Sequence, residues 1–200
     1  MDKKTIKTIQ MAYSQGRSAQ EISQELGLSW KKVIYWMNKY GIKRRNRSEA
    51  TYLKRNPTEP FKIKRGLTED EQQLKTLAVG LYLGEGSKRQ KNSVRLSNSD
   101  PTIISIFIQF LRVICGVPEE KIKISLLLHP DIKTRETERF WSNHLNIPLG
   151  QFTKTTILKR RGNGTYKNRS LYGVATVYVH NLKLRNILQN WVEEHTCKFS

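Results

Sequence analysis

The feature that most constrains this chain is the segment 67–86, which carries the signals for one long helix. Thr68 is followed three positions later by Glu71, which is the spacing of a capping box at a helix N-terminus. The acids of this first turn also suit the positive end of the helix dipole. An apolar run follows, and Gly86 is expected to end the helix.

Two glycines and one acid distinguish the second half of this helix. Gly80 and Gly84 are four residues apart, so they share a helix face and let another backbone approach closely. Glu85 falls in the last turn, where the negative end of the dipole disfavours a carboxylate, so its position calls for a cation. A partner helix is the expected neighbour of the glycine face. The alternative is tight packing within one chain, with Glu85 a solvated acid.

Charge is the strongest signal of the whole chain. Lys and Arg number 36 against 17 Asp and Glu, a net charge of +19, of which +11 falls in residues 1–66 and +8 in the remainder. Polyanions are therefore the expected partners. Composition alone favours DNA and RNA equally, so the motifs must decide between them.

The remaining composition places the chain inside the cell. With 200 residues and 37% hydrophobic content it can bury a core, and no apolar run approaches the roughly 20 residues of a membrane-spanning helix. The N-terminus does not resemble a signal peptide, so a cytoplasmic location is expected, at the nucleoid in a prokaryote. Cys115 and Cys197 lack metal-ligand spacing and are expected to be reduced thiols.

Residues 1–45 are predicted to form three short helices. Ser18 and Glu21 have capping-box spacing, Gly27 supplies a turn, and Ser29 can start the third helix. The apolar residues expected to form the core of this module are Ile6, Ile9, Met11, Tyr13, Ile22, Leu26, Val33, Trp36, Met37 and Tyr40.

The pattern of this module resembles the helix-turn-helix domains of site-specific recombinases and many bacterial regulators. The resemblance implies that the third helix enters the major groove of DNA, with Lys32 nearer to phosphate. The residues then expected to contact DNA are Ser29, Trp30, Lys31, Lys32, Ile34, Tyr35, Asn38, Arg44 and Arg45. Two alternatives stay open: partial burial of Trp30 and Ile34, and an ordinary three-helix packing unit.

Residues 46–66 are predicted to be a basic linker. Residues 46–52 can form a short helix, but Pro57 and Pro60 interrupt regular structure. The spread of Lys and Arg along this segment suits contact with a phosphate backbone or a minor groove. A solvated linker without contacts is an equal alternative.

Residues 67–200 are predicted to form an α+β domain, so that the fold class of the chain is a three-helix module followed by this domain. After the opening helix, the expected elements are strands at 87–88 and 93–97, a helix from Pro101 to Ile114, a strand at 121–126, a helix at 134–145, strands at 152–160 and 172–180, and a helix at 182–194.

The run Val79–Gly86 resembles the signature of the LAGLIDADG homing endonuclease family, and Val94–Asp100 resembles the strand and helix start that follow in its αββαββα unit. The likeness covers most of residues 70–195, with an extra strand and helix near 121–146. It implies that two signature helices pack side by side and that the sheets form a saddle over a DNA duplex. One signature per chain implies a homodimer on a near-palindromic site.

The resemblance also assigns roles to residues. Glu85 and Gly84 are the expected ligands of Mg²⁺ or another divalent cation, because two copies of Glu85 at the dimer axis tolerate each other only with a proton or cation between them. Asn98 and Lys154, or Lys159 in place of Lys154, are candidates for positioning water or neutralising the transition state. The dimer interface is assigned to Gly80, Leu81 and Gly84. The sheet residues expected to contact DNA are Lys88, Arg89, Lys91, Arg95, Ser97, Lys159, Arg161, Lys167 and Arg169.

Three functions remain open from the sequence. The leading hypothesis is metal-dependent cleavage of a specific double-stranded DNA site. The first alternative is a transcriptional regulator that keeps the fold for dimerisation and DNA contact without cutting. The second is an RNA-binding or splicing-assisting protein. A solvated, functionless basic sheet face is the alternative to any nucleic-acid surface.

Overall fold

The computed structural model describes residues 3–56, 59–87, 89–158 and 170–197. The chain divides into two compact units, residues 1–59 and residues 60–200, and each is described by itself. In the described part of the chain, no helix is long and apolar enough to cross a membrane.

The first unit contains four helices: α1 (Lys3–Ser14), α2 (Ala19–Glu25), α3 (Trp30–Lys39) and α4 (Arg47–Arg55). The predicted capping box is present at α2, where the Glu21 amide donates to Ser18 Oγ at 3.1 Å and the Ser18 amide donates to Glu21 Oε2 at 2.7 Å. These hydrogen bonds lower the pKa of Glu21 below its ordinary value. Gly27 has a positive φ of 61°, as the turn before α3 requires.

The core of the first unit is smaller than the sequence predicts. Its buried residues are Ile9, Ala12, Ile22, Val33 and Met37. Met11 is 63% exposed and Tyr40 is 51% exposed, so their prediction as core residues is wrong. Met11 lies on the face of α1 turned away from this cluster, and Tyr40 is the C-cap residue beyond the end of α3. A module of three short helices has too little interior to bury every apolar side chain.

Arg45, which lies between α3 and α4 in the sequence, binds the end of α1. Its guanidinium carbon lies 4.0 Å from the centre of the Tyr13 ring, and Nη1 donates to the Gly16 carbonyl at 3.0 Å. Nη2 donates to the Tyr13 carbonyl, and the Arg45 amide donates to Tyr13 Oη at 2.8 Å. The side chain therefore donates to carbonyls at and just after the end of α1, and the Tyr13 carbonyl also accepts the Gly16 amide at 3.0 Å.

The predicted linker 46–66 is divided between the two units. Helix α4 begins with a capping box between Asn46 and Glu49 and buries no residue. Phe61, in contrast, is buried in the core of the second unit, and the Lys64 amide donates to the Ile114 carbonyl at 2.9 Å.

The second unit is built on a four-stranded sheet. Its strands are β1 (Val94–Asn98), β2 (Lys123–Leu128), β3 (Thr156–Ile157) and β4 (Val174–Val179), in the spatial order β1-β4-β2-β3. Strand β4 pairs antiparallel with both β1 and β2, whereas β3 pairs parallel with β2. Together with the helices, this mixed sheet confirms the α+β class.

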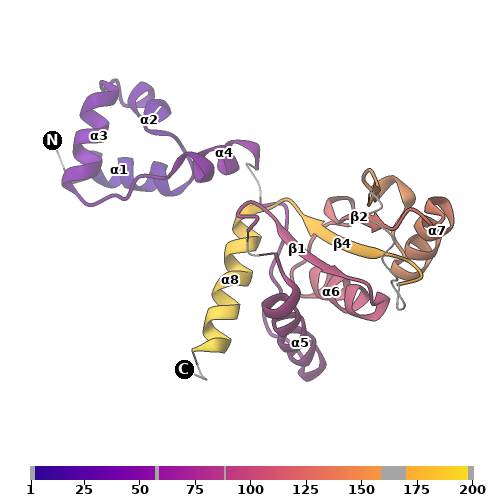
Figure 1. The fold of residues 1–200 in the computed structure, drawn as a ribbon. Coiled ribbons are helices and arrows are strands. Elements are labelled where there is room, and N and C mark those ends of the chain that lie inside the picture. The colour runs from indigo at the N-terminus through magenta and orange to yellow at the C-terminus, as the bar shows by residue number, and fades with distance from the viewer. Residues whose placement is uncertain (1–2, 57–58, 88, 159–169, 198–200) are drawn as a thin grey trace. The chain divides into compact units, whose positions relative to one another are not determined.

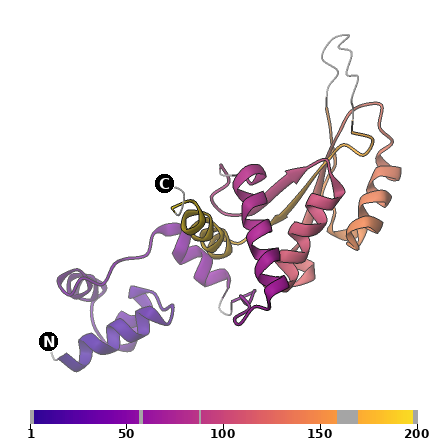
Figure 2. The ribbon, with the colours of Figure 1, turned by 90° about the horizontal axis from the view of Figure 1, so that it is seen from below.

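Three helices, α5 (Glu69–Glu85), α6 (Pro101–Val113) and α8 (Leu182–Thr196), lie on one side of the sheet (Figure 1 and Figure 2). Helix α7 (Thr134–Leu145) packs against α6, and short 3₁₀ turns lie at Glu119–Lys121 and Leu149–Gln151. The predicted capping box at Thr68 and Glu71 is present at the start of α5.

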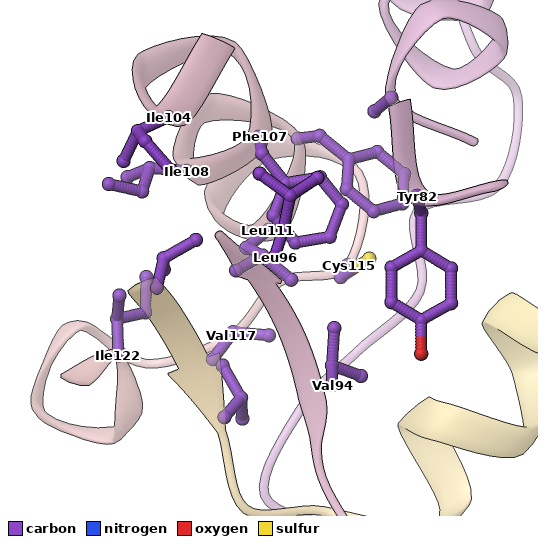
Figure 3. Packing of buried hydrophobic residues seen from close by; sticks show 14 of the residues in the cluster. Tyr82, Val94, Leu96, Ile104, Phe107, Ile108, Leu111, Cys115, Val117 and Ile122 are labelled. Atoms are coloured by element: carbon purple, nitrogen blue, oxygen red, sulfur yellow. The ribbon is translucent and has the colours of Figure 1, made fainter. Parts of the chain in front are cut away.

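The core of the second unit lies between the sheet and these helices. Leu96 from β1 and Phe107, Ile108 and Leu111 from α6 are fully buried there (Figure 3). The Tyr82 ring of α5 stacks on Phe107 with their centres 5.9 Å apart. Cys115 is buried in this core and Cys197 is exposed, and neither forms a disulfide.

Several predicted strands differ from those observed. The strand at 87–88 is reduced to one antiparallel bridge between Gly86 and Leu96, and Lys88 lies outside the described residues. Of the predicted strand 152–160, the described part contains only β3 and a bridge from Phe152 to Ile124.

Strand β2 is an integral part of the sheet and not an addition to it. It pairs with the central strand β4 over five residue pairs from Lys123 to Leu127. The strand predicted at 121–126 is thus present, and it lies inside the sheet between β4 and β3. The local pattern of residues cannot show this, because alternation marks a strand without naming the strand that pairs with it.

Candidate nucleic-acid interface

The face of the sheet opposite the helices is polar. On β1, Val94 and Leu96 are buried in the core, whereas Arg95 and Ser97 point to the other face. The same alternation on β2 and β4 turns Lys123, Ser125, Leu127, Val174, Thr176 and Tyr178 to that face. We call these eight residues the open sheet face. None of the described helices of the second unit lies over it (Figure 1).

Strand register arranges the polar residues of the open sheet face into two rows. The first row runs Arg95–Tyr178–Lys123 and the second Ser97–Thr176–Ser125, each across β1, β4 and β2. In the first row the Arg95 guanidinium lies 4.7 Å from the centre of the Tyr178 ring. In the second, Ser97 Oγ and Thr176 Oγ1 are 2.8 Å apart. A row of two cations thus lies beside a row of three hydroxyls.

His180 borders the first row. Its ring lies 5.1 Å from that of Tyr178 in an edge-to-face arrangement. Burial, and secondarily the positive charge of Arg95, lowers the pKa of His180. A polyanion on this face would offset the charge of Arg95 and so raise that pKa.

The sequence predicts only part of this surface. Arg95 and Ser97 were predicted, and the structure places both on the open sheet face. Lys123, Ser125, Thr176 and Tyr178 were not. The alternation in Val174–Val179 and Lys123–Leu128 was the available signal, but only the register shows that these side chains adjoin Arg95 and Ser97.

Of the other residues predicted to contact DNA in the second unit, two are exposed and the rest lie outside the described residues. Arg89 and Lys91 are exposed in the connection between the Gly86 bridge and β1. The predicted contacts that lie outside the described residues are Lys88, Lys159, Arg161, Lys167 and Arg169.

The glycine face of α5 is open. No atom among the described residues lies within 4 Å of a Cβ built on Gly80 or Gly84, so the alternative that these glycines serve tight packing within one chain is wrong. Leu77 and Leu83 flank them and are 50% and 38% exposed. Leu81, predicted in the dimer interface, instead packs against the core of its own chain.

Glu85 is exposed at the end of α5, beside the edge strand of the sheet. The Gly86–Leu96 bridge and a 3.0 Å hydrogen bond from the Ser87 amide to the Arg95 carbonyl attach this helix end to β1. The antiparallel register brings the end of α5 next to the Ser97–Asn98 end of that strand. Glu85 is therefore an exposed carboxylate at the helix end that is attached to edge strand β1.

The two proposed catalytic partners of Glu85 are separated. Asn98 ends β1, the strand to which the end of α5 is attached, and its Oδ1 already accepts a hydrogen bond from the Asp100 amide at 2.9 Å. Lys154 precedes β3, at the opposite edge of the sheet. Three strand spacings of about 4.8 Å put some 14 Å between those edges, so Lys154 and Glu85 of one chain do not share a site.

A divalent cation does not fit one chain alone. Across residues 3–56, 59–87, 89–158 and 170–197, no three His, Cys, Asp or Glu side chains gather at a potential metal site. One carboxylate and the backbone carbonyl of Gly84 are too few protein ligands for tight binding, because Mg²⁺ prefers six oxygen ligands. Glu85 would need a second copy, or phosphate oxygens, to complete a site.

The first unit presents a second candidate surface on α3. Trp30 and Tyr35 are 50% and 56% exposed, and Lys31, Lys32 and Asn38 are also exposed. Ile34 is half-buried, as one alternative proposed. Ser29 serves the helix itself, because its Oγ accepts the Lys32 amide at 3.3 Å.

The two arginines that follow α3 differ in their contacts. Arg44 is exposed, whereas Arg45 is bound to Tyr13 and Gly16 within the first unit. The assignment of Arg45 to DNA is thereby replaced by a structural role. Lys39 lies over the ring of Trp36, with Nζ 5.1 Å from its centre.

Comparisons with protein-family models, with curated proteins and with solved structures find no match to this chain. The function must therefore be argued from the residues.

Proposed function

We propose that this protein binds double-stranded DNA at specific sequences, through the open sheet face and through α3. The observation that carries the proposal is the pair of cross-strand rows, which place Arg95 and Lys123 beside three hydroxyls on a surface that no described helix of its unit covers. Cations attract phosphates, and hydroxyls donate to phosphates and to base edges. The net charge of +19 acts in the same direction.

Duplex DNA is favoured over RNA by the form of α3. This helix exposes a face of polar and aromatic side chains, including Lys31, Tyr35 and Asn38. The major groove of B-DNA is about 12 Å wide and admits a helix, whereas that of A-form RNA is too deep and narrow. A helical reading surface therefore suits DNA.

We further propose that the protein acts as a homodimer through α5. Gly80 and Gly84 leave the helix backbone open to a neighbour, and the exposed Leu77 and Leu83 give that contact apolar area. Packing of two such helices would bring two Glu85 carboxylates and two open sheet faces together. A dimer of this kind suits a near-palindromic DNA site.

DNA cleavage is the second part of this proposal. The exposed position of Glu85, at the helix end attached to edge strand β1, favours it, since a duplex bound across the sheet would reach this edge. Glu85 from both chains would hold Mg²⁺, which when bound polarises phosphate and activates water. Without such a site the same dimer is a non-cleaving regulator.

Binding is tested by fluorescence anisotropy with the full chain and labelled duplex DNA from a random-sequence selection. The double substitution Arg95→Ala/Lys123→Ala should lower affinity by at least tenfold and flatten the salt dependence, since each lost phosphate contact removes about 0.9 from the slope of log K against log salt. The matched control is Arg135→Ala/Arg139→Ala, which removes two exposed charges from α7, the helix that packs against α6.

If the control variant lost as much DNA affinity, the effect of the double substitution would be explained by net charge and not by contacts of the open sheet face. Tighter binding of single-stranded or duplex RNA than of the selected DNA would favour the RNA-binding alternative.

Cleavage is tested with supercoiled plasmid carrying the selected site, with Mg²⁺ or with EDTA. Linear product that requires Mg²⁺ and disappears in Glu85→Gln, while binding persists, supports the endonuclease. Retained binding with no linear product in the unaltered protein supports the regulator.

A further inference from the structure

The outward face of α3 carries Lys31, Tyr35 and Asn38, which are spaced four and then three residues apart. Val33 and Met37 are fully buried, and Lys31, Tyr35 and Asn38 lie on the other side of the helix. Tyr35 is 56% exposed. These three side chains are therefore the ones that a DNA groove would meet first.

Asn38 has the chemistry that recognises adenine. Its carboxamide carries a donor and an acceptor side by side, which match N7 and the N6 amino group of adenine in the major groove. The carboxamide is exposed, whereas that of Asn46 is used in the cap of α4. Asn38 is thus presented for an external partner.

Tyr35 has the chemistry that contacts thymine. Its ring offers an apolar surface to the thymine methyl group, which cytosine lacks. The ring is held in place by an edge-to-face contact with Trp36, with the ring centres 5.1 Å apart. A fixed aromatic surface discriminates better than a mobile one because less side-chain entropy is lost on binding.

Arginine, the residue that most often specifies guanine, is absent from α3. Of its three lysines, Lys39 lies over the Trp36 and Tyr35 rings, Lys32 lies at the side of the helix, and Lys31 is on the outward face. The helix rises about 1.5 Å per residue, so Tyr35 and Asn38 are about 4.5 Å apart along it, close to one base-pair step of about 3.4 Å.

We infer that α3 specifies adjacent A·T base pairs, with Asn38 recognising the adenine of one pair and Tyr35 the thymine methyl of the next. The inference rests on the proposed binding of double-stranded DNA and names the bases that this binding selects.

The test begins with selection of a random duplex library by the full chain. The selected consensus should contain adjacent A·T pairs. Replacing the adenine assigned to Asn38 should weaken binding by roughly 5- to 100-fold, and Asn38→Ala should abolish that preference while leaving preferences at other positions intact. The matched control is Gln24→Ala, an exposed amide on α2 that should change no base preference.

Tyr35 is tested by deleting one methyl group from the DNA. Replacing the assigned thymine with uracil should weaken binding of the unaltered protein severalfold and leave that of Tyr35→Ala unchanged, because that variant has no ring for the methyl to contact.

The outcomes separate this inference from the proposed function. A consensus without A·T pairs, or an Asn38→Ala variant that keeps every base preference, overturns the inference and leaves DNA binding standing. Failure to select any duplex overturns both.

Discussion

Ser97 and Thr176 share a hydrogen bond of 2.8 Å between their hydroxyl oxygens on adjacent strands of the open sheet face. The two residues are 79 positions apart in the sequence. One hydroxyl of the pair donates to the other, so one hydrogen remains to donate outward, and Ser125 adds another hydroxyl on the far side of Thr176. This centre of the surface has hydrogen-bonding groups but no charge.

Thr176→Val should weaken DNA binding severalfold with little change in stability. Valine has nearly the same shape, and a hydrogen bond such as that of this half-buried hydroxyl pair contributes only about 0.5–1.5 kcal/mol to folding. Affinity for the selected duplex and urea unfolding are the two measurements. Thr102→Val, at an exposed position on α6, is the control. Unaltered affinity in Thr176→Val would remove the hydroxyl row from the interface.

Gly80→Ala should stabilise the single chain and weaken the dimer. The new methyl meets no atom within 4 Å, and alanine is favoured over glycine in a helix by up to about 1 kcal/mol. The midpoint of urea unfolding at low protein concentration should therefore rise. Sedimentation should show a dissociation constant that increases at least tenfold.

Gln109→Ala alters an exposed position on α6, outside the proposed α5 interface, and serves as the comparison. A dimer unaffected by Gly80→Ala, or a protein monomeric at all concentrations with and without DNA, would contradict the proposed α5 interface.

Arg45→Met should destabilise the first unit by about 1–3 kcal/mol, because it removes the donor to the Gly16 carbonyl and the cation over the Tyr13 ring. Lysine should not restore stability, since it lacks the planar fork of donors. Thermal unfolding followed by circular dichroism measures the effect. Arg44→Met, at the exposed neighbouring position, should leave the unfolding temperature unchanged. Equal stability of the two variants would refute the bracing role of Arg45.

Protonation of His180 should oppose folding and favour DNA binding. Its pKa in the folded chain lies below the ordinary value of about 6.5, so the unfolded chain binds more protons as the pH falls below that value. Stability contributed by neutral His180 is thus complete above pH 6.5 or so and declines toward the folded-state pKa. Urea unfolding between pH 5 and 8 should show a smaller acid loss in His180→Gln.

Acid weakens folding through His180, but it should strengthen DNA binding through the same residue. Phosphates near Arg95 raise the pKa of His180, so the affinity of the unaltered protein should rise more steeply than that of His180→Gln as the pH falls from 7 to 5.5 or so. Parallel pH profiles for the two proteins would place the DNA away from this edge of the sheet.

Local features of the sequence predicted the helices well. The capping boxes of α2 and α5 lie where Ser18 and Glu21, and Thr68 and Glu71, predict them, and α7 spans the predicted residues 134–145. Such signals act over three or four residues, so they can be recognised without knowing the fold. The α+β class followed from the same local patterns.

Contacts between residues far apart in the chain could not be predicted from the sequence. Leu81 packs against the core beside the open Gly80 because of where α6 and β1 lie. Arg45 forms its hydrogen bonds because the end of α1 lies next to it. The exposure of Met11 and Tyr40 likewise reflects how little core three short helices enclose.

The sequence by itself determined the helices, the basic charge, the polar alternation of β1 and the carboxylate at the end of α5. Only the tertiary structure decided that β4 lies between β1 and β2, which joins Arg95 to Lys123 and Ser97 to Ser125 through Tyr178 and Thr176. The reason is that a strand's side-chain period of two fixes which residues share a face, whereas its neighbours in a sheet are chosen by packing of the whole core.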